Sequence, residues 1–343
     1  MSVAPRNPAV VNRRRPRATL GGVALAAVLA LAACGTTDSV DPGAGPTASG
    51  TAAATPSATD TEGPASSAAA TAATATSSSS GPATSAAAIP GVPARITSAG
   101  TIKVGSEVAY PPMEFLAADG KTPQGFDIDL FTAVAGKLGV RAQFENTKFD
   151  SILIGVQSGR YDVGLSAFTI TKERLAAVNM VSYLSVGTQW AAKKGDAAGI
   201  SPDDACGKRV AVQTATTQQK DVQARSTACQ KAGKPAIDIL SEPDGQVPFN
   251  DVLTGKADAA LSDLVVVADV LRKTGGQLET VGQSYGTAPF GFAVAKKDTA
   301  FAQALATATG QLIADGTYAQ LATKWNVENA KVARSEVNPA VTD

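Results

Sequence analysis

Residues Gln157 to Arg174 read Q-S-G-R-Y-D-V-G-L-S-A-F-T-I-T-K-E-R, and this stretch decides the predicted fold. We expect a helix to end at Gly159, because glycine takes the left-handed conformation without steric strain. A short strand is predicted from Tyr161 to Leu165, followed by a polar loop. The strand would bring Ser166 and Thr169 to its carboxyl end, the edge where open α/β sheets bind their ligands.

Arg174 ends this stretch at a distance that lets its guanidinium face the same point. A guanidinium beside two hydroxyls suits a carboxylate, because its planar fork of donors matches the two carboxylate oxygens. Alternatively, the hydroxyls cap the next helix and the arginine lies on a solvated helix face. Both interpretations fit these residues taken alone.

A second copy of the pattern favours the ligand site. Residues Val252–Ser262, V-L-T-G-K-A-D-A-A-L-S, align with Val156–Ser166, V-Q-S-G-R-Y-D-V-G-L-S. Both copies predict a helix, a glycine, a basic residue, an aspartate, a strand and a serine. The second copy leads to Asp263, whereas the first leads to Arg174. Two similar lobes, one offering a cation and the other an anion, would form a clamp for a zwitterion.

Composition excludes several classes of function. The chain has 343 residues, yet its first aromatic residue is Tyr110, so we expect the folded part to begin near Arg95. Lys and Arg together number 30, as do Asp and Glu, and this balance argues against a nucleic-acid partner. The chain contains no histidine, which excludes imidazole bases and His-ligated metals. We expect no cofactor and no metal.

The start of the chain predicts export. An arginine-rich beginning precedes the apolar run 20–33, which is shorter than the ~20 residues needed to span a bilayer. The run ends in L-A-A-C at 31–34, which resembles the lipobox of bacterial lipoproteins and implies cleavage before Cys34 and lipidation of its sulfur. Residues 1–33 would then be a signal peptide, and the protein would be anchored to the outer face of the cytoplasmic membrane. An ordinary secretory signal is the alternative.

Residues 34–94 consist largely of Ala, Thr, Ser, Gly and Pro, a composition that predicts a disordered tether. With Cys34 assigned to lipid, Cys206 and Cys229 remain as an even pair in an exported chain, and we predict a disulfide between them. Two free thiols are the alternative.

The folded part opens with a predicted buried strand, Thr101–Ser106, that ends in a loop. A regular helix follows, with apolar residues at helical spacing from Ile128 to Leu138 before Gly139. Asp127 is expected to cap its amino end.

This helix also carries a resemblance. Its sequence G-F-D-I-D-L-F-T-A-V-A-G-K-L, Gly125–Leu138, is similar throughout to the signature of the bacterial extracellular solute-binding proteins of family 3, the polar amino-acid receptors of ABC importers. Other stretches agree in the same order: V-G-S-E-V-A-Y-P-P-M-E-F, S-A-F-T-I-T-K-E-R, G-K-R-V-A-V-Q-T-A-T-T-Q, A-D-A-A-L-S-D and A-D-G-T-Y-A-Q-L-A-T-K-W. The resemblance extends from about Ile96 to Val327.

The resemblance implies a two-lobed α/β fold of the periplasmic-binding-protein type (type II), with two crossover strands as a hinge and the ligand in the cleft between the lobes. The crossovers would lie near Thr188–Ala192 and Tyr285–Phe290. The first lobe would comprise residues 95–188 and 288–333, and the second residues 189–287. Residues 334–343 are expected to be a disordered tail.

Carried over by position, the family pattern assigns the α-carboxylate of the ligand to Arg174 and its α-ammonium to Asp263. Ser166, Thr169 and Thr217 would add hydrogen bonds, with Thr217 opening the helix of the second lobe. Tyr110 and Phe149 correspond to aromatic walls around the ligand side chain, and plain core packing is the alternative for each. Three positions depart from the family pattern: Met113, Ala167 and Ala215, the last standing where glycine is usual.

Glu107 corresponds to the residue that meets the far end of the ligand. A buried carboxylate attracts an ammonium or guanidinium and repels another carboxylate. We therefore expect a basic or amide side chain and not glutamate or aspartate. The alternative is that Glu107 turns away to a neighbouring lysine.

The sequence thus predicts a monomeric, non-enzymatic receptor whose cleft closes on an amino acid and is then recognised by an ABC permease and its ATPase. A dehydratase of the same fold acting on cyclohexadienyl acids is one alternative. A receptor that feeds a signalling partner is the other.

Overall fold

The structure is a computed structural model that describes residues 89–196 and 199–341. The predicted signal peptide, the lipidation site Cys34 and nearly all of the predicted tether lie outside these described residues. In the part of the chain that is described, no helix is both long and apolar enough to cross a membrane.

Within the described residues, the strands form one sheet of eight and one of three. The eight-stranded sheet has the order β5-β1-β6-β11-β7-β10-β8-β9, and the small sheet has the order β2-β3-β4. The strands are β1 Thr101–Ser106, β2 Ala109–Tyr110, β3 Glu114–Leu116, β4 Pro123–Gln124, β5 Arg141–Asn146, β6 Val163–Gly164, β7 Val178–Lys193, β8 Arg209–Gln213, β9 Asp238–Glu242, β10 Ala259–Asp263 and β11 Leu278–Ala295.

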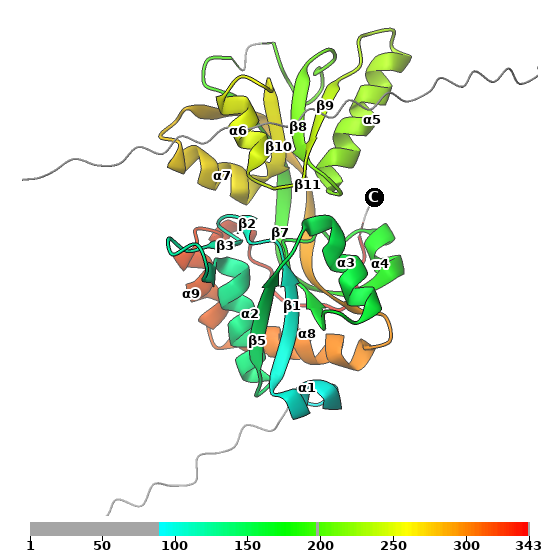
Figure 1. The fold of residues 1–343 in the computed structure, drawn as a ribbon, viewed down its shortest axis with the longest axis vertical. Coiled ribbons are helices and arrows are strands. Elements are labelled where there is room, and N and C mark those ends of the chain that lie inside the picture. Colours follow the sequence, from blue (N-terminus) through cyan, green and yellow to red (C-terminus); the bar gives the residue numbers. More distant parts are fainter. Residues whose placement is uncertain (1–88, 197–198, 342–343) are drawn as a thin grey trace, which may run out of the picture. The chain divides into compact units, whose positions relative to one another are not determined.

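Two long strands join two α/β lobes. β7 and β11 pair with each other in antiparallel fashion along almost their whole length, and Figure 1 shows them running between the two sets of shorter strands. β11 pairs with β6 of the first lobe at Ala293 and Val294, whereas β7 pairs with β10 of the second lobe from Thr188 to Ala192. The predicted two-lobed α/β fold with two connecting strands is confirmed.

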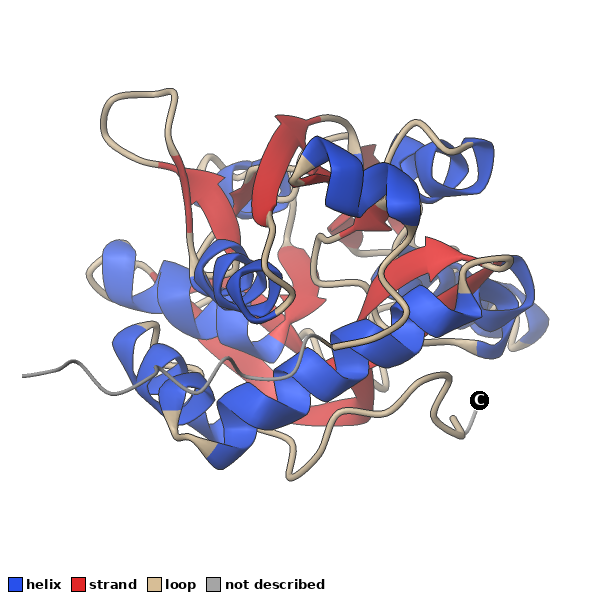
Figure 2. Ribbon diagram, turned by 90° about the horizontal axis from the view of Figure 1, so that it is seen from below, coloured by secondary structure: helices blue, strands red, loops and turns tan. Residues whose placement is uncertain are grey.

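Helices lie beside the strands in both lobes, and Figure 2 shows the helices around the strands in a view turned by 90° from that of Figure 1. Their bounds are α1 Ala94–Ala99, α2 Phe126–Lys137, α3 Phe149–Ser158, α4 Lys172–Ala177, α5 Thr217–Lys231, α6 Val247–Leu253, α7 Leu264–Lys273, α8 Thr299–Ala314 and α9 Thr317–Lys324, with a 3-10 helix at Glu328–Ala330.

Aromatic side chains fill the core of the first lobe. The Tyr183 and Phe292 rings stack with their centroids 4.5 Å apart, and Phe131 meets Phe292 edge-on at 5.2 Å. Smaller apolar residues of β8 and β10 build the core of the second lobe around Trp190 and Val222. The main cluster of buried apolar residues also contains residues of both lobes, such as Phe131 of the first and Phe249 of the second.

The repeated sequence pattern produces two matching structural units. α3 ends at Ser158, and Gly159 follows with a φ of 79° before β6. α6 ends at Leu253, and Gly255 follows with a φ of 76° before β10. β6 is shorter than the predicted strand, but both strands run parallel to a neighbour, so their carboxyl ends deliver side chains to one edge of each lobe.

The prediction that Asp127 caps α2 is wrong. The residue before the helix is Gly125, and Asp127 is fully buried. Oδ2 of Asp127 accepts hydrogen bonds from the Tyr183 hydroxyl at 2.7 Å and from the backbone N–H of Ala167 at 3.1 Å. A carboxylate in the first helical turn can point inward as well as toward the helix end, and here the lobe interior supplies donors for it.

The prediction of a disordered tail from residue 334 is also wrong for the described part of the tail. The backbone N–H of Asn338 donates to Met180 at 2.7 Å, and the N–H of Ser182 donates to Glu336 at 2.9 Å. β7 pairs with β10 only from Thr188 onward, so its earlier residues present an open edge on that side. The tail occupies this edge because exposed backbone donors and acceptors of a strand seek partners.

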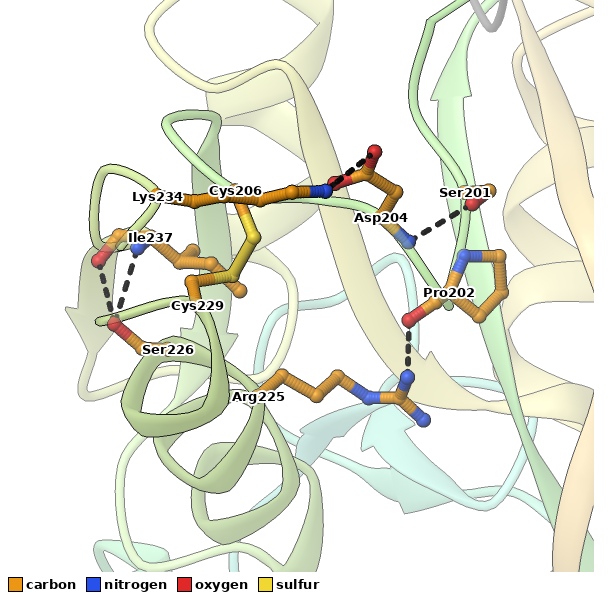
Figure 3. Close-up of a disulfide and its surroundings, with 9 residues drawn as sticks. All are labelled: Ser201, Pro202, Asp204, Cys206, Arg225, Ser226, Cys229, Lys234 and Ile237. Carbon is orange, nitrogen blue, oxygen red and sulfur yellow. Dashed lines mark hydrogen bonds and ion pairs between the residues drawn. A yellow bond between two sulfur atoms is a disulfide. The ribbon is translucent and has the colours of Figure 1, made fainter. Parts of the chain in front are cut away.

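A disulfide joins Cys206 to Cys229, as predicted, and links the loop before β8 to the last turns of α5 (Figure 3). Hydrogen bonds support this corner of the second lobe. Ser226 exchanges hydrogen bonds with the backbone of Ile237, and the Arg225 guanidinium donates to the Pro202 carbonyl.

Replacing Cys206 and Cys229 together by serine should lower the free energy of unfolding by about 3 kcal/mol, because the bridge closes a loop with a sequence separation of 23 residues and restricts the unfolded chain. Chemical denaturation of both proteins measures the difference. Dithiothreitol should destabilise the wild type and leave the double variant unchanged. Equal stability of oxidised wild type and variant would refute a stabilising bridge.

Candidate functional site

All eight side chains that the sequence assigned to a ligand line one pocket. Both lobes contribute to it: its lining residues are Glu107, Tyr110, Glu114, Phe149, Ser166, Ala167, Thr169, Arg174, Gln213, Thr216, Thr217, Gln218 and Asp263.

Arg174 lies in α4, at the end of the loop that follows β6. Its Nη1 donates to the Thr169 carbonyl at 2.7 Å, and its Nη2 donates to the Ala215 carbonyl of the second lobe at 3.3 Å. The guanidinium carbon also lies 5.7 Å from the ring centroid of Phe149 and 5.1 Å from that of Phe168. Two carbonyls and two aromatic faces thus fix the cation in place.

The Arg174 guanidinium makes no ion pair with any other described side chain. Burial lowers its pKa to about 10, and the attraction of Asp263 opposes this shift. A cation that is partly removed from water and bound only by neutral groups is stabilised when an anion binds to it. Because three of its five N–H donors remain after the two carbonyl bonds, it can still bind a carboxylate in bidentate fashion.

Asp263 lies at the end of β10, on the opposite lobe, and is 6% exposed. Its Oδ2 accepts from the Tyr110 hydroxyl at 2.7 Å, and its Oδ1 accepts from Nε2 of Gln218 at 2.8 Å. Burial raises its pKa to about 6, whereas these two hydrogen bonds and the attraction of Arg174 oppose the shift. No described cation forms an ion pair with this carboxylate, which keeps lone pairs for a further donor.

The two predicted aromatic walls behave differently. Tyr110 does more than provide a ring face, because its hydroxyl bonds Asp263 across the cleft and also lies 2.7 Å from Oγ of Ser262. Phe149 stacks on Phe168 with centroids 4.6 Å apart and also lines the pocket, so it takes part in both core packing and the site.

The three predicted hydroxyls also differ in what they can offer. Oγ of Ser166 donates to Glu114 at 2.9 Å and accepts from the Glu107 N–H at 3.2 Å, so it retains only an acceptor lone pair. Thr169 supplies its carbonyl to Arg174. Thr217 is the first residue of α5, as expected, whereas the hydroxyl that caps this helix belongs to Thr216 and accepts from the N–H of Gln219 at 3.0 Å.

Glu107 faces into the pocket and does not turn away to a lysine. Its Oε2 accepts from Nε2 of Gln213 at 2.5 Å, a bond that crosses from the second lobe to the first. Burial raises its pKa to about 7, the bond from Gln213 opposes the rise, and repulsion from Asp244 and Asp150 adds to it. This end of the pocket is therefore poor in positive charge.

A pair of buried acids lies behind the pocket in the first lobe. Glu114 and Asp127 are both fully buried and interact with each other. Burial raises the pKa of both carboxyl groups above the usual range. Oε2 of Glu114 and Oδ1 of Asp127 accept from no described group, so one shared proton would satisfy both oxygens.

Two alanines adopt the left-handed conformation in pocket loops. Ala167 has a φ of 46° and Ala215 a φ of 64°, values that disfavour residues with a Cβ atom. Other bonds hold these backbones: Asp127 accepts from the N–H of Ala167, and Oε1 of Gln219 accepts from the N–H of Ala215 at 2.9 Å. Ala215 is the position where the sequence pattern suggested a glycine, and its conformation explains that preference.

The fold of the chain and the residues that line its pocket can be compared with those of known proteins. The sequence model of the bacterial extracellular solute-binding proteins, family 3, matches residues 102–328. The chain belongs to this family. The predicted family membership is therefore confirmed, and a place outside the cytoplasm follows from it.

Relatives within family 3 are named as amino-acid-binding proteins. The chain is similar to the arginine-binding protein ArgT of Corynebacterium glutamicum, with 34% identity over 248 residues covering 72% of this chain and 81% of ArgT. It is also similar to the L-cystine-binding protein TcyJ of Escherichia coli K12, with 30% identity over 237 residues covering 68% of this chain and 86% of TcyJ.

Solved structures agree with the fold. An ancestral arginine-binding protein bound to arginine superposes with a TM-score of 0.61 at 31% identity, covering 66% of this chain and 98% of that one. Because relatives with different named ligands share this family 3 fold, the ligand of each member depends on its own pocket.

Sequence reasoning missed several lining residues of this family 3 pocket. Gln213 is the last residue of β8, so the rule that found Ser166 and Asp263 at strand ends would also have found it. Glu114 gave no such signal, because an acid within an apolar stretch reads as a surface residue. Gln218 follows Thr217 in the first turn of α5 and was overlooked as a helix-surface side chain.

Ala215→Gly should raise the free energy of unfolding by roughly 1 kcal/mol, because it removes the cost of a left-handed alanine. Ala228→Gly is the matched control: Ala228 lies exposed inside α5, where glycine should lower stability by about 1 kcal/mol. Chemical denaturation compares the two. A loss of stability in both variants would contradict strain at residue 215.

Glu114→Gln should reduce the pH dependence of stability. The raised pKa values of Glu114 and Asp127 stabilise the folded state at low pH, and this contribution is lost as pH rises through the folded-state pKa values. The glutamine amide can donate to Asp127 at every pH. Calorimetry from pH 5 to 9 should therefore show a smaller fall in Tm for the variant, by several degrees, with roughly 2–4 °C corresponding to each kcal/mol.

Glu328→Gln, at an exposed residue, is the control and should follow the wild-type curve. Parallel curves for Glu114→Gln and wild type would show that the buried pair shares no proton.

Proposed function

We propose that the protein is an extracytoplasmic receptor that closes on a polar L-amino acid and delivers it to an ABC permease and its ATPase. The relatives described above are named as binding proteins for amino acids, which supports this class of ligand. The ligand side chain would be basic or an amide, because Glu107 offers a carboxylate at one end of the pocket.

One observation carries the proposal: a half-buried guanidinium and a buried carboxylate line one pocket from opposite lobes, and neither has an ionic partner among the described residues. An α-amino acid brings a carboxylate for Arg174 and an ammonium for Asp263 in a single molecule. Each charge of the ligand therefore compensates a desolvated charge of the protein.

Closure of the lobes would couple binding to transport. Three hydrogen bonds described above cross the cleft, from Tyr110, Arg174 and Gln213, and Lys220 of α5 pairs with Glu173 of α4 at its rim. A ligand that touches both Arg174 and Asp263 gains its full affinity only when these contacts form. It therefore shifts the population toward the closed form, which the permease would recognise.

We further propose that the receptor is a monomer held to the membrane by a lipid on Cys34. The L-A-A-C pattern supports the lipid, and the composition of residues 34–94 supports a flexible tether with a reach on the order of 45 Å. Mass spectrometry of the membrane-extracted protein tests this assignment, since the lipidated form should begin at Cys34 with a diacylglyceryl group.

We propose no enzymatic activity. A dehydratase would need a general acid aimed at a departing hydroxyl. Both oxygens of Asp263 already accept hydrogen bonds, and its charge is better matched to a ligand ammonium. Incubation with prephenate should give no aromatic product, and formation of such a product would overturn this point.

Arg174→Ala should weaken amino-acid binding by at least about 30-fold, because it leaves the ligand carboxylate desolvated and unpaired, a loss of roughly 2–5 kcal/mol. Asp263→Asn should weaken binding for the corresponding reason at the ammonium. Arg141→Ala, at an exposed arginine of β5, is the control and should bind like wild type. Isothermal titration calorimetry after a thermal-shift screen of the natural amino acids measures these affinities. Near-normal affinity in Arg174→Ala would refute the clamp.

A further inference from the structure

Gln213 is a buried side chain of the pocket that is hydrogen-bonded to neither Arg174 nor Asp263. It ends β8 of the second lobe and is 6% exposed. Its Nε2 donates to Oε2 of Glu107 at 2.5 Å and to the Pro243 carbonyl at 3.4 Å. The side chain therefore connects the loop after β9 to the acid of the first lobe.

These two bonds fix the orientation of the Gln213 amide. A carboxylate and a carbonyl both accept hydrogen bonds, so the NH2 group must face them, and both of its N–H bonds are used. Oε1 of Gln213 is consequently an acceptor, and no described donor reaches it with a hydrogen bond. The same holds for Oε1 of Glu107, because the bond from Gln213 goes to Oε2.

The neighbouring loop keeps this end of the pocket narrow. A Cβ atom on Gly245 would lie 2.5 Å from Cδ2 of Tyr110 and 3.2 Å from Oε1 of Gln213, so only glycine allows the loop to approach this closely. The charged neighbours that act on Glu107 are Asp244 and Asp150, both acids. The acceptor atoms left without a donor here are thus Oε1 of Glu107 and Oε1 of Gln213, and both charged residues that act on Glu107 are negative.

We propose that Gln213 is a specificity-determining residue that makes this end of the pocket accept hydrogen bonds only, and that it thereby restricts the ligand to amino acids with a cationic side chain. The inference rests on the proposed function and narrows its ligand class from basic or amide to basic. Gln213 contributes to this selection in two ways. It holds Glu107 in place, and it presents its own Oε1 from the other lobe.

The chemistry of the ligand end decides the selection. A guanidinium or ammonium carries only donors, so it can bridge Oε1 of Glu107 and Oε1 of Gln213 and compensate the acidic surroundings. A terminal amide or urea also carries a carbonyl oxygen, which would face acceptors or remain buried without a donor. Sites built for one hydrogen-bonding pattern reject a ligand of the opposite pattern strongly.

Arginine and citrulline provide the test, because they have nearly the same shape and citrulline carries a urea in place of the guanidinium. Calorimetry on the wild type should give at least about 30-fold tighter binding of arginine than of citrulline, and of lysine than of glutamine. In Gln213→Met, which keeps the length of the side chain without its amide, arginine should bind about 10-fold more weakly. The arginine-to-citrulline ratio should fall toward unity, which a purely structural role of Gln213 would not produce.

Gln230→Leu, at an exposed residue of α5, is the control and should leave both affinities unchanged. Wild type that binds citrulline or glutamine within about threefold of the cationic ligand would overturn the inference, while the receptor function would stand. An unchanged ratio in Gln213→Met would remove Gln213 from specificity. If no natural amino acid binds the wild type, the proposed function fails and the inference fails with it. Should Gln213→Met not fold, the wild-type ratios still decide the ligand class.

Discussion

The closed pocket depends on holding two opposite charges, one half-buried and one buried, on different lobes without pairing them. Arg174 and Asp263 attract each other through the pocket: Asp263 raises the pKa of Arg174, and Arg174 lowers the pKa of Asp263. Neutral groups nevertheless bind each charge and keep the two from pairing. Carbonyls of Thr169 and Ala215 hold the cation, and the donors of Tyr110 and Gln218 hold the anion. A direct ion pair would satisfy both charges and leave nothing for a ligand. The separation therefore preserves electrostatic free energy for binding.

The fold makes this separation possible because one structural unit occurs twice. In each lobe a helix, a left-handed glycine and a parallel strand end at the cleft, with Ser166 after β6 and Asp263 at the end of β10. β7 and β11 connect the lobes by their backbone pairing, and the register between them shifts at three places, between Val281 and Gly291. These irregular places interrupt the regular backbone ladder between the lobes, which is where a hinge of this fold would bend.

The sequence predicted those parts that follow from periodicity and strand ends. β1 has the predicted bounds, and the strand-end rule brought Ser166, Arg174 and Asp263 to one pocket. The sequence alone could not predict features that depend on the direction in which a side chain points within a lobe. Asp127 seemed to be a helix cap because only the tertiary structure supplies Tyr183 as a donor. The tail seemed disordered because its partner, the open edge of β7, arises only when β10 pairs from Thr188 onward.

The pocket has more acidic than basic side chains, and this excess of negative charge affects which ligand it binds. Among the lining residues that the structure describes, Glu107, Glu114 and Asp263 are acids and Arg174 is the one cation. Burial opposes ionisation of all three acids, so a neutral ligand would leave Glu107 near half-ionised at a pH near its pKa of about 7. A cationic side chain changes this, because its attraction favours the ionised acid and lowers that pKa. Binding of such a ligand should therefore release protons from the site. A receptor with this excess of acids gains the most binding free energy from a ligand whose net charge is positive. The same excess of acids therefore favours cationic ligands and lowers the stability of the protein without a ligand.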